Sequence, residues 1–585
     1  MAQTKMPLFF PQARNLASQP RTQRFWTLPL TLLFLTECVI LLVNAVLPLR
    51  GLWFYDALLA QLGSWSLFPK HLLFPRLQTM VGQGHSRMPI SLNTTWRETY
   101  LLFGVFILLF LLYLLAVYIL SRRVSWCYVM LSTLLLGATL ALCPVVASQD
   151  IFSYILYARM EVFYHLNPFT NPPTTIHNDA AYPFVFWVKQ SSLYGPTWIL
   201  ITSGIQELAR LCGLTSVPSM VLLLRFFSLA MHLASTLLIW SIVGHVQGKN
   251  VLCSSLAQTR RVQATLAFAW NPALLFEACI NAHSDTTVLF LLLLTLWLLL
   301  PRLQTTRYAN FLAVVAFAAA ICLKVNFLLL LPGFFLFVWT QRTYLSMLKR
   351  VINVAGVAVV CGITILLFYA PFLQHAQIIQ LLLINPNTAH DANSLYEILV
   401  RFYAGYTHIT IPSATRPTGI AIENSSHIAS TILFLIVYAV LCVRALLVPC
   451  SINTLPALVR WMMLAWLAYC LLGTPWFWSW YMVTFFGLFA LVEADQIERD
   501  SWLGFLRISL VARTLAFTLL SVYCFYTWAP HIALIHLFFN TPVLYLRGLW
   551  IWGPPLLVFC LYPFIRNSQR RTSQRTSTEV LPSPS

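Results

Sequence analysis

Ionisable side chains are scarce in this chain, so the few that stand close together are the candidates for chemistry. Asp150 follows an apolar run and precedes 151–164, a stretch without a helix breaker. A carboxylate at a helix start is held ionised by the free N–H groups and the helix dipole. Such a group can act as a general base. Spacings of three or four residues predict that further polar residues share its helix face: Tyr154, Tyr157 and Glu161. The alternative from spacing alone is that Asp150 is a helix cap.

A second polar constellation occupies 271–285, at the turn between two very apolar runs. Glu277 falls about one turn inside the apolar region, where a charge is costly and usually functional. Asn281, His283 and Asp285 follow, and they could bind a phosphate or sugar group or hold a base in position. Asp285 could equally cap the next helix, with His283 bonded to backbone. One His and one Asp without a third ligand nearby is weak evidence for a metal site.

Three further features could face the same space. Lys324 interrupts an apolar run, where it either snorkels to the interface, the more common behaviour, or pairs with an anion such as phosphate. The aromatic residues of 194–198, starting at Tyr194, and of 476–481, including Trp480 and Tyr481, fit an interfacial belt. They would also suit a platform for sugar rings. A polar loop at 385–397 contains His390 and Asp391, and its role stays open.

The elements that must position these residues are membrane helices. Of 585 residues, 59% are hydrophobic and only 9% are charged. Apolar runs recur from end to end, each long enough to cross roughly 30 Å of hydrocarbon. The net charge of +19 does not indicate nucleic acid, because Lys and Arg cluster in short loops and so report orientation in the membrane. The thirteen Cys residues form no C-x-x-C pair and are expected to be core residues.

Alternating basic loops predict an all-α polytopic protein of about fourteen transmembrane helices with both termini cytoplasmic. The run 196–212 is expected to be a juxtamembrane helix on the outer face, because every later basic loop then lies inside. We expect the chain to divide into four parts: a cytoplasmic segment, 1–24; a transmembrane domain that would hold the catalytic site, 25–495; C-terminal transmembrane helices, 496–565; and a disordered cytoplasmic tail, 566–585.

The three long polar segments of this topology all face outside: 51–99, 148–217 and 374–427. No glycine-rich phosphate-binding motif follows a strand pattern, so a soluble nucleotide-binding domain is not expected. Chemistry at the extracytoplasmic face of a plasma membrane has no ready supply of nucleotide donors. A lipid-carried substrate is therefore the natural alternative.

The ordered set of motifs resembles the GT-C glycosyltransferases, and within them the bacterial polyprenol-phosphate-mannose-dependent α-(1,6)-mannosyltransferases. The resemblance runs from about residue 100 to 495 and rests on these stretches: Asp150 with Tyr154, Arg159 and 166–169; Tyr-Gly-Pro-x-Trp at 194–198; Asn271 to Asp285; Lys324; and Trp480-Tyr481. It departs from the family pattern at Ala282, where glycine is expected.

The resemblance implies an inverting glycosyltransferase of the GT-C fold. It would move a mannosyl or other hexosyl unit from a polyprenyl-phosphate donor in the bilayer to a lipid or glycan acceptor. Asp150 would be the base, and the departing phosphate would be stabilised by Lys324, Arg159 and His283. The remaining candidate binding residues are Tyr154, Glu161, Tyr194, Glu277, Asn281, Asp285, Trp480 and Tyr481. No cofactor is expected and a metal is not obligatory, because a phosphate diester is a good leaving group.

Two other classes of protein stay open. A transporter or flippase of a lipid-linked sugar would carry charged or broken helices at the midplane and inverted repeats, neither of which is clear. A non-catalytic scaffold gives no reason for the polar residues to gather at outer helix ends. Within the enzyme class, a GT-C relative that transfers another sugar, or a phosphate-linked group onto lipid A, is the further alternative.

Overall fold

The computed structural model describes residues 21–47, 92–143, 146–246, 255–301, 307–341, 346–373, 393–395, 398, 417–448, 452–495, 505–525 and 547–561. Most of the predicted segments 1–24, 51–99 and 374–427, with His390 and Asp391, lie outside these residues, as does the tail 566–585. The account below concerns the described part of the chain.

Every regular element in the described residues is helical, which confirms the all-α prediction. The principal helices are α1 (Arg21–Val46), α4 (Leu92–Leu120), α5 (Trp126–Ala141), α6 (Asp150–Tyr164), α7 (Pro196–Leu211), α8 (Val217–Val246), α9 (Ser255–Ala269), α10 (Pro272–Cys279), α11 (Asp285–Leu298), α12 (Arg307–Leu323), α13 (Leu331–Gln341), α14 (Met347–Tyr369), α17 (Pro417–Leu447), α18 (Leu455–Ala468), α19 (Met482–Asp495) and α20 (Phe505–Phe525).

Six helices in the described residues are long and apolar enough to cross a membrane: Thr27–Val46, Thr99–Leu120, Val217–Val246, Met347–Phe372, Ile428–Leu447 and Leu455–Gly473. Shorter apolar helices of 10–17 residues accompany them. The prediction of about fourteen spans stays a prediction, since several apolar runs are cut short by polar turns. One example is α11, which begins only at Asp285.

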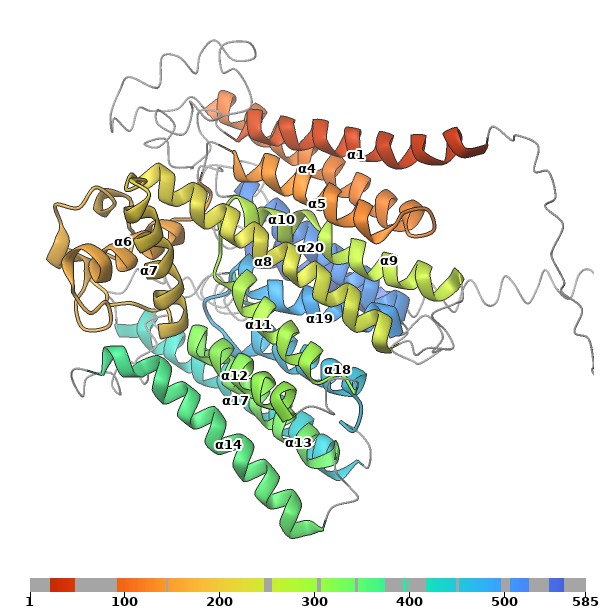
Figure 1. Ribbon diagram of the computed structural model, residues 1–585. Coiled ribbons are helices and arrows are strands. Elements are labelled where there is room, and N and C mark those ends of the chain that lie inside the picture. Colours follow the sequence, from red (N-terminus) through yellow and green to blue (C-terminus); the bar gives the residue numbers. More distant parts are fainter. Residues whose placement is uncertain are drawn as a thin grey trace, which may run out of the picture.

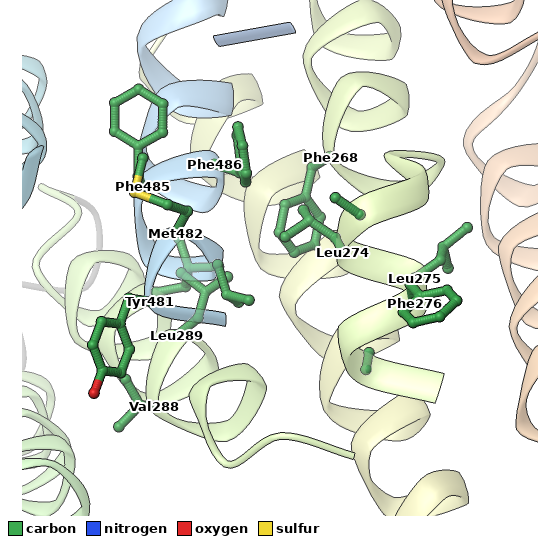
Figure 2. Packing of buried hydrophobic residues seen from close by; sticks show 14 of the residues in the cluster. Phe268, Leu274, Leu275, Phe276, Val288, Leu289, Tyr481, Met482, Phe485 and Phe486 are labelled. Atoms are coloured by element: carbon green, nitrogen blue, oxygen red, sulfur yellow. The ribbon is translucent and has the colours of Figure 1, made fainter. Parts of the chain in front are cut away.

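The apolar helices form one bundle, and α6 and α7 stand at one end of it (Figure 1). The bundle core lies between α9, α10, α11 and α19, where large apolar side chains interdigitate (Figure 2). By contrast, only 11% of the α14 span and 6% of the α17 span are buried inside the protein. Exposed apolar faces of this length suit contact with lipid.

Local sequence explains where the helices next to α6 begin. Pro196 and Pro272 each occupy a first helical position, where the missing N–H costs no hydrogen bond. The side chain of Asn271 caps α10 by accepting a hydrogen bond from the N–H of Ala273 at 3.1 Å. Residues 196–212, predicted to be a surface helix, form α7, which packs against α6 at the end of the bundle.

Candidate functional site

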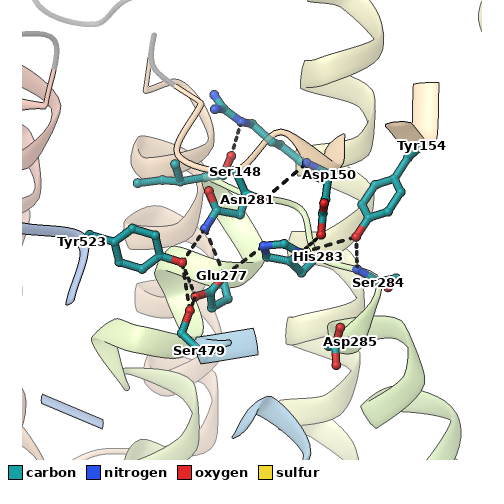
Figure 3. A network of polar contacts seen from close by, with 12 residues as sticks. Ser148, Asp150, Tyr154, Glu277, Asn281, His283, Ser284, Asp285, Ser479 and Tyr523 are labelled. Carbon is teal, nitrogen blue, oxygen red and sulfur yellow. Dashed lines mark hydrogen bonds and ion pairs between the residues drawn. The ribbon is translucent and has the colours of Figure 1, made fainter. Parts of the chain in front are cut away.

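Asp150 is the first residue of α6 and belongs to a polar cluster (Figure 3). Gln149, and not Asp150, occupies the N-cap position, so the carboxylate is not consumed as a cap. The Asp150 side chain is 18% exposed. Burial raises the pKa of Asp150 to about 6, the hydrogen bond from Tyr194 opposes this rise, Asp285 adds to it, and Lys324 opposes it. The result is a carboxylate that is ionised near neutral pH yet unusually basic.

His283 lies opposite Asp150, in the turn between α10 and α11. Its Nδ1 is 3.8 Å from Oδ2 of Asp150 and 3.4 Å from the hydroxyl of Tyr154. The ring is fully buried and stacks on Trp480, with ring centroids 4.0 Å apart. Burial and the charge of Lys324 lower the pKa of His283 well below its usual range, so the imidazole is neutral.

The turn that presents His283 is conformationally unusual. The N–H of His283 donates to the Glu277 carbonyl at 3.1 Å, which closes the chain back onto α10. Ala282, just before it, has φ of 52°. This left-handed region favours glycine, the residue that the family pattern leads us to expect at this position.

Glu277 is buried in α10 and lies on the other side of His283. Its carboxylate accepts hydrogen bonds from the hydroxyls of Ser479 and Tyr523 and from the amide of Asn281, the last at 3.0 Å. Oε2 of Glu277 is also 3.3 Å from Nε2 of His283, although the angle falls short of a hydrogen bond. Asp150, His283 and Glu277 thus form a chain of carboxylate, imidazole and carboxylate.

Lys324 occupies a break in its apolar run, between α12 and the 3₁₀ helix η6 (Val325–Leu330). Its Nζ pairs with Oδ1 of Asp285 at 2.5 Å and lies 4.0 Å from the centroid of the Tyr481 ring. The side chain is 17% exposed. The lysine therefore pairs with an anion of the protein itself and keeps an accessible edge.

A close backbone contact joins the Tyr194 loop to the Lys324 segment. The N–H of Gly195 donates to the Leu323 carbonyl at 3.2 Å. A Cβ atom at position 195 would lie only 1.9 Å from the carbonyl oxygen of Cys322, so only glycine fits here. Tyr194, which contacts Asp150, is thereby held next to the segment that carries Lys324.

The aromatic residues of 476–481 pack beside His283. Trp480 lies between His283 and Trp478, and the two indole rings are nearly parallel with centroids 5.1 Å apart. Trp476 contacts Trp478 edge-on, with centroids 5.2 Å apart. Trp480 therefore lies against His283, and Tyr481 lies against Lys324. The two faces of Trp480 are covered by protein rings, so its position is fixed.

The structure does not bring Arg159 and Glu161 to this cluster. Both lie near the other end of α6, about three turns from Asp150. Arg159 forms an ion pair with Asp179 at 2.9 Å and donates to the Thr215 carbonyl at 3.0 Å. Glu161 accepts a hydrogen bond from Ser203 of α7. The phosphate-binding role predicted for Arg159 has no support from this position.

Two residues of the network were not singled out by sequence reasoning. Ser479 was noticed only as part of the aromatic stretch, and Tyr523 lies in α20, beyond the stretch of family resemblance. The sequence feature that could have identified Tyr523 is a hydroxyl group in an otherwise apolar helix. This feature is too common to indicate a functional residue by itself. In the described residues no group of three or more His, Cys, Asp or Glu side chains could hold a metal ion.

This arrangement combines the parts that group transfer to a hydroxyl requires. Asp150 can accept a proton, Lys324 can face an anion, and the histidine beside Asp150 is neutral. Lys324 is connected to this cluster through its ion pair with Asp285, the first residue of α11.

Comparison with known proteins gives one match. No curated protein and no solved structure matches the chain significantly. Residues 72–341, which hold Asp150, Glu277, His283 and Lys324, match the family described as alpha-(1->6)-mannopyranosyltransferase, N-terminal domain. This match confirms the predicted resemblance and supports a glycosyltransferase with membrane helices. Residues 72–341 are thus similar to the N-terminal domain of the alpha-(1->6)-mannopyranosyltransferase family.

Proposed function

We propose that this protein is an inverting glycosyltransferase that moves a mannosyl unit from a polyprenyl-phosphate donor to a hydroxyl of a lipid or glycan acceptor. The observation that carries the proposal is the partly exposed Asp150 carboxylate, held close to His283 and in the same cluster as the Lys324–Asp285 pair. The family match over residues 72–341 supports mannose as the sugar.

In the proposed reaction, Asp150 takes the proton from the acceptor hydroxyl as its oxygen attacks the anomeric carbon. The bond from that carbon to the phosphate oxygen breaks on the opposite face, and the electron pair leaves with the polyprenyl phosphate. Lys324 stabilises the developing negative charge, and Asp285 orients the ammonium group toward it. A β-linked donor then gives an α-linked product.

The position of the cluster supports catalysis at the extracytoplasmic face of the plasma membrane. The cluster lies at the end of the bundle that α6 and α7 occupy, and basic loops are predicted at the opposite face. The exposed apolar faces of α14 and α17 offer contact with the bilayer, where the isoprenoid tail of the donor would lie.

A transfer assay tests the proposal. The full chain in nanodiscs is incubated with radiolabelled polyprenyl-phosphate mannose and a crude lipid or glycan extract, with Asp150→Asn beside the wild type. Glu207→Gln is the matched control, because Glu207 is an exposed carboxylate on α7 that pairs with Arg210. We expect labelled product from the wild type and the control, and a loss of at least about 10³-fold for Asp150→Asn.

Two outcomes would contradict the proposal. An active Asp150→Asn enzyme would remove the proposed base. Folded wild-type protein that transfers no sugar from any polyprenyl-phosphate donor would favour a transporter, and uptake of the labelled lipid across sealed vesicles would then be measured.

A further inference from the structure

A chain of polar groups continues from the Asp150–His283 pair into α20, outside the family domain. Given the proposed function, we propose that Tyr523 is a positioning residue: it holds the Glu277 carboxylate, which fixes His283 so that Nδ1 of this imidazole can accept a hydrogen bond from Asp150 once Asp150 has taken up the acceptor proton. The contacts that carry the proposal run from Tyr523 to Glu277, from Glu277 to His283, and from His283 to Asp150.

Glu277 is surrounded by donors. Oε1 accepts from the hydroxyls of Tyr523 and Ser479, and Oε2 accepts from the amide of Asn281. The same amide donates to the Tyr523 hydroxyl at 3.0 Å, and the two hydroxyl oxygens are 3.0 Å apart. Hydrogen bonds of this kind favour the ionised carboxylate, which can only accept. Burial raises the pKa of Glu277, and the hydrogen bonds from Ser479, Tyr523 and Asn281 oppose this rise. Tyr523 is therefore one of three groups that favour a negative charge beside His283.

A negative charge at this place selects one tautomer of His283. The neutral ring carries its proton on the nitrogen that faces the carboxylate, which is Nε2, 3.3 Å from Glu277. Nδ1 is then an acceptor, and it faces Asp150 at 3.8 Å and the Tyr154 hydroxyl at 3.4 Å. Such long contacts are usual in a site without substrate, where catalytic hydrogen bonds tighten on binding.

This tautomer gives the protonated Asp150 carboxyl group a hydrogen-bond acceptor. After the acceptor O–H bond has broken, the proton lies on the Asp150 carboxyl group. Nδ1 of the neutral His283 ring can then accept a hydrogen bond from this carboxyl group, while burial and the charge of Lys324 disfavour the imidazolium. Trp480 covers one face of the His283 ring at 4.0 Å, which prevents the ring from turning away.

Several other groups also set the charge state of Asp150, and the test must separate them from Glu277. Tyr154 and Tyr157 come from α6, Tyr194 from the loop before α7, and Tyr481 from the short helix Ser479–Tyr481. His283 lies in the turn before α11, Asp285 is the first residue of α11, and Lys324 precedes η6. None of them is altered by a substitution at Tyr523.

The experiment is a double-mutant cycle on the full chain in nanodiscs, with Tyr523→Phe, Glu277→Gln and the combined variant. We expect kcat to fall about 10- to 100-fold for Glu277→Gln and about tenfold or less for Tyr523→Phe, with little change in the donor KM. If Tyr523 acts through Glu277, the combined variant is no worse than Glu277→Gln alone. The acid limb of the kcat profile also moves to lower pH in Glu277→Gln, because removing a negative neighbour lowers the pKa of Asp150.

Tyr113→Phe is the matched control. Tyr113 is equally buried, and its hydroxyl also makes one buried hydrogen bond, to the Ala267 carbonyl at 2.8 Å, away from the site. The fold-loss of kcat in Tyr113→Phe should multiply with that of Glu277→Gln in the combined variant. The acid limb of the kcat–pH profile should stay in place in Tyr113→Phe. If Glu277→Gln does not fold, the same cycle is run with His283→Gln, which interrupts the chain one step closer to Asp150.

Multiplying losses for Tyr523→Phe and Glu277→Gln, or an acid limb that stays in place, would overturn the positioning role. That result is distinguishable from failure of the proposed function, because it requires an active wild-type enzyme and an inactive Asp150→Asn variant. Absence of transfer by the wild type would contradict the glycosyltransferase proposal instead.

Discussion

The two ends of α6 both carry charged residues, but the side chains differ in how fully they are paired. At its C-terminal end, Arg159 is closed into an ion pair with Asp179, and Glu161 is bonded to Ser203. At its N-terminal end, Asp150 is partly exposed and faces a histidine that is too distant for a hydrogen bond. The same helix thus has one end whose charges hold the structure together and one end whose charge is still available to a substrate.

The difference shows why the density of ionisable residues along a sequence is a poor measure of function. Arg159 and Asp150 belong to one motif of the family resemblance. Arg159, however, is bound by Asp179, 20 residues further on, and is therefore not placed to bind a phosphate. What distinguishes the N-terminal end is a carboxylate with raised pKa and a side chain that is 18% exposed.

The largest effect on turnover is expected from removing Lys324, the cation near the N-terminal end of α6. Lys324→Gln should lower kcat about 10²- to 10³-fold, because the departing phosphate loses its nearest positive charge. Steady-state transfer kinetics measure the effect. Asp285→Asn is the companion variant, since it keeps the cation but releases it from its partner. Unchanged turnover in Lys324→Gln would assign phosphate stabilisation to another group.

A pH profile sharpens the comparison next. Asp150 must be ionised to accept a proton, and its pKa is raised to about 6. The rate should therefore be constant above that pH and fall about tenfold for each pH unit below it, because protonation of the base removes activity. Initial transfer rates between pH 4.5 and 8, corrected for stability, measure this. A rate that stays flat down to pH 4.5 would contradict Asp150 as a base with a raised pKa.

The C-terminal end of α6 should respond in the opposite way. Arg159→Ala leaves the buried Asp179 without its cation, so unfolding should become easier by about 3 kcal/mol, while kcat of the folded protein changes only a few-fold. Thermal unfolding in detergent and transfer kinetics separate the two effects. A loss of turnover comparable with that of Lys324→Gln, at unchanged stability, would mean that Arg159 acts in the reaction after all.

The smallest expected effect concerns backbone strain next to each end. His165, which follows α6, and Ala282, beside the start of α6, both have φ of 52°. Replacing either by glycine should stabilise the protein by about 1 kcal/mol, because a Cβ atom is unfavourable in this conformation. Melting temperatures of His165→Gly and Ala282→Gly provide the measurement. Destabilisation by Ala282→Gly would mean that its methyl group contributes more packing than strain.

Local patterns predicted much of this molecule. The start of α6 at Asp150, the existence of the helix α7, and the clustering of Glu277, Asn281, His283 and Asp285 all follow from helix breakers, caps and polar interruptions. These features depend on residues close together in sequence, so one chain suffices to find them.

The features that could not be predicted depend on distant partners. The run around Lys324 reads as one continuous apolar span, yet the chain breaks there, and the lysine pairs with Asp285, 39 residues earlier. Tyr523 meets Glu277 across 246 residues. A hydroxyl or a lysine in an apolar helix gives no sign of the partner that it will find, because that depends on how the helices pack.

The contact between Gly195 and the carbonyl of Cys322 has a consequence for how this family of sites can diverge. No side chain of any size can be accepted at position 195 unless two backbone segments separate. A substitution at this position is therefore not tolerated. The same holds for a one-residue insertion on either side that would place another residue opposite Cys322. We therefore expect sequence variation in related chains to accumulate around this junction, while the contact between the Tyr194 loop and the Lys324 segment is kept.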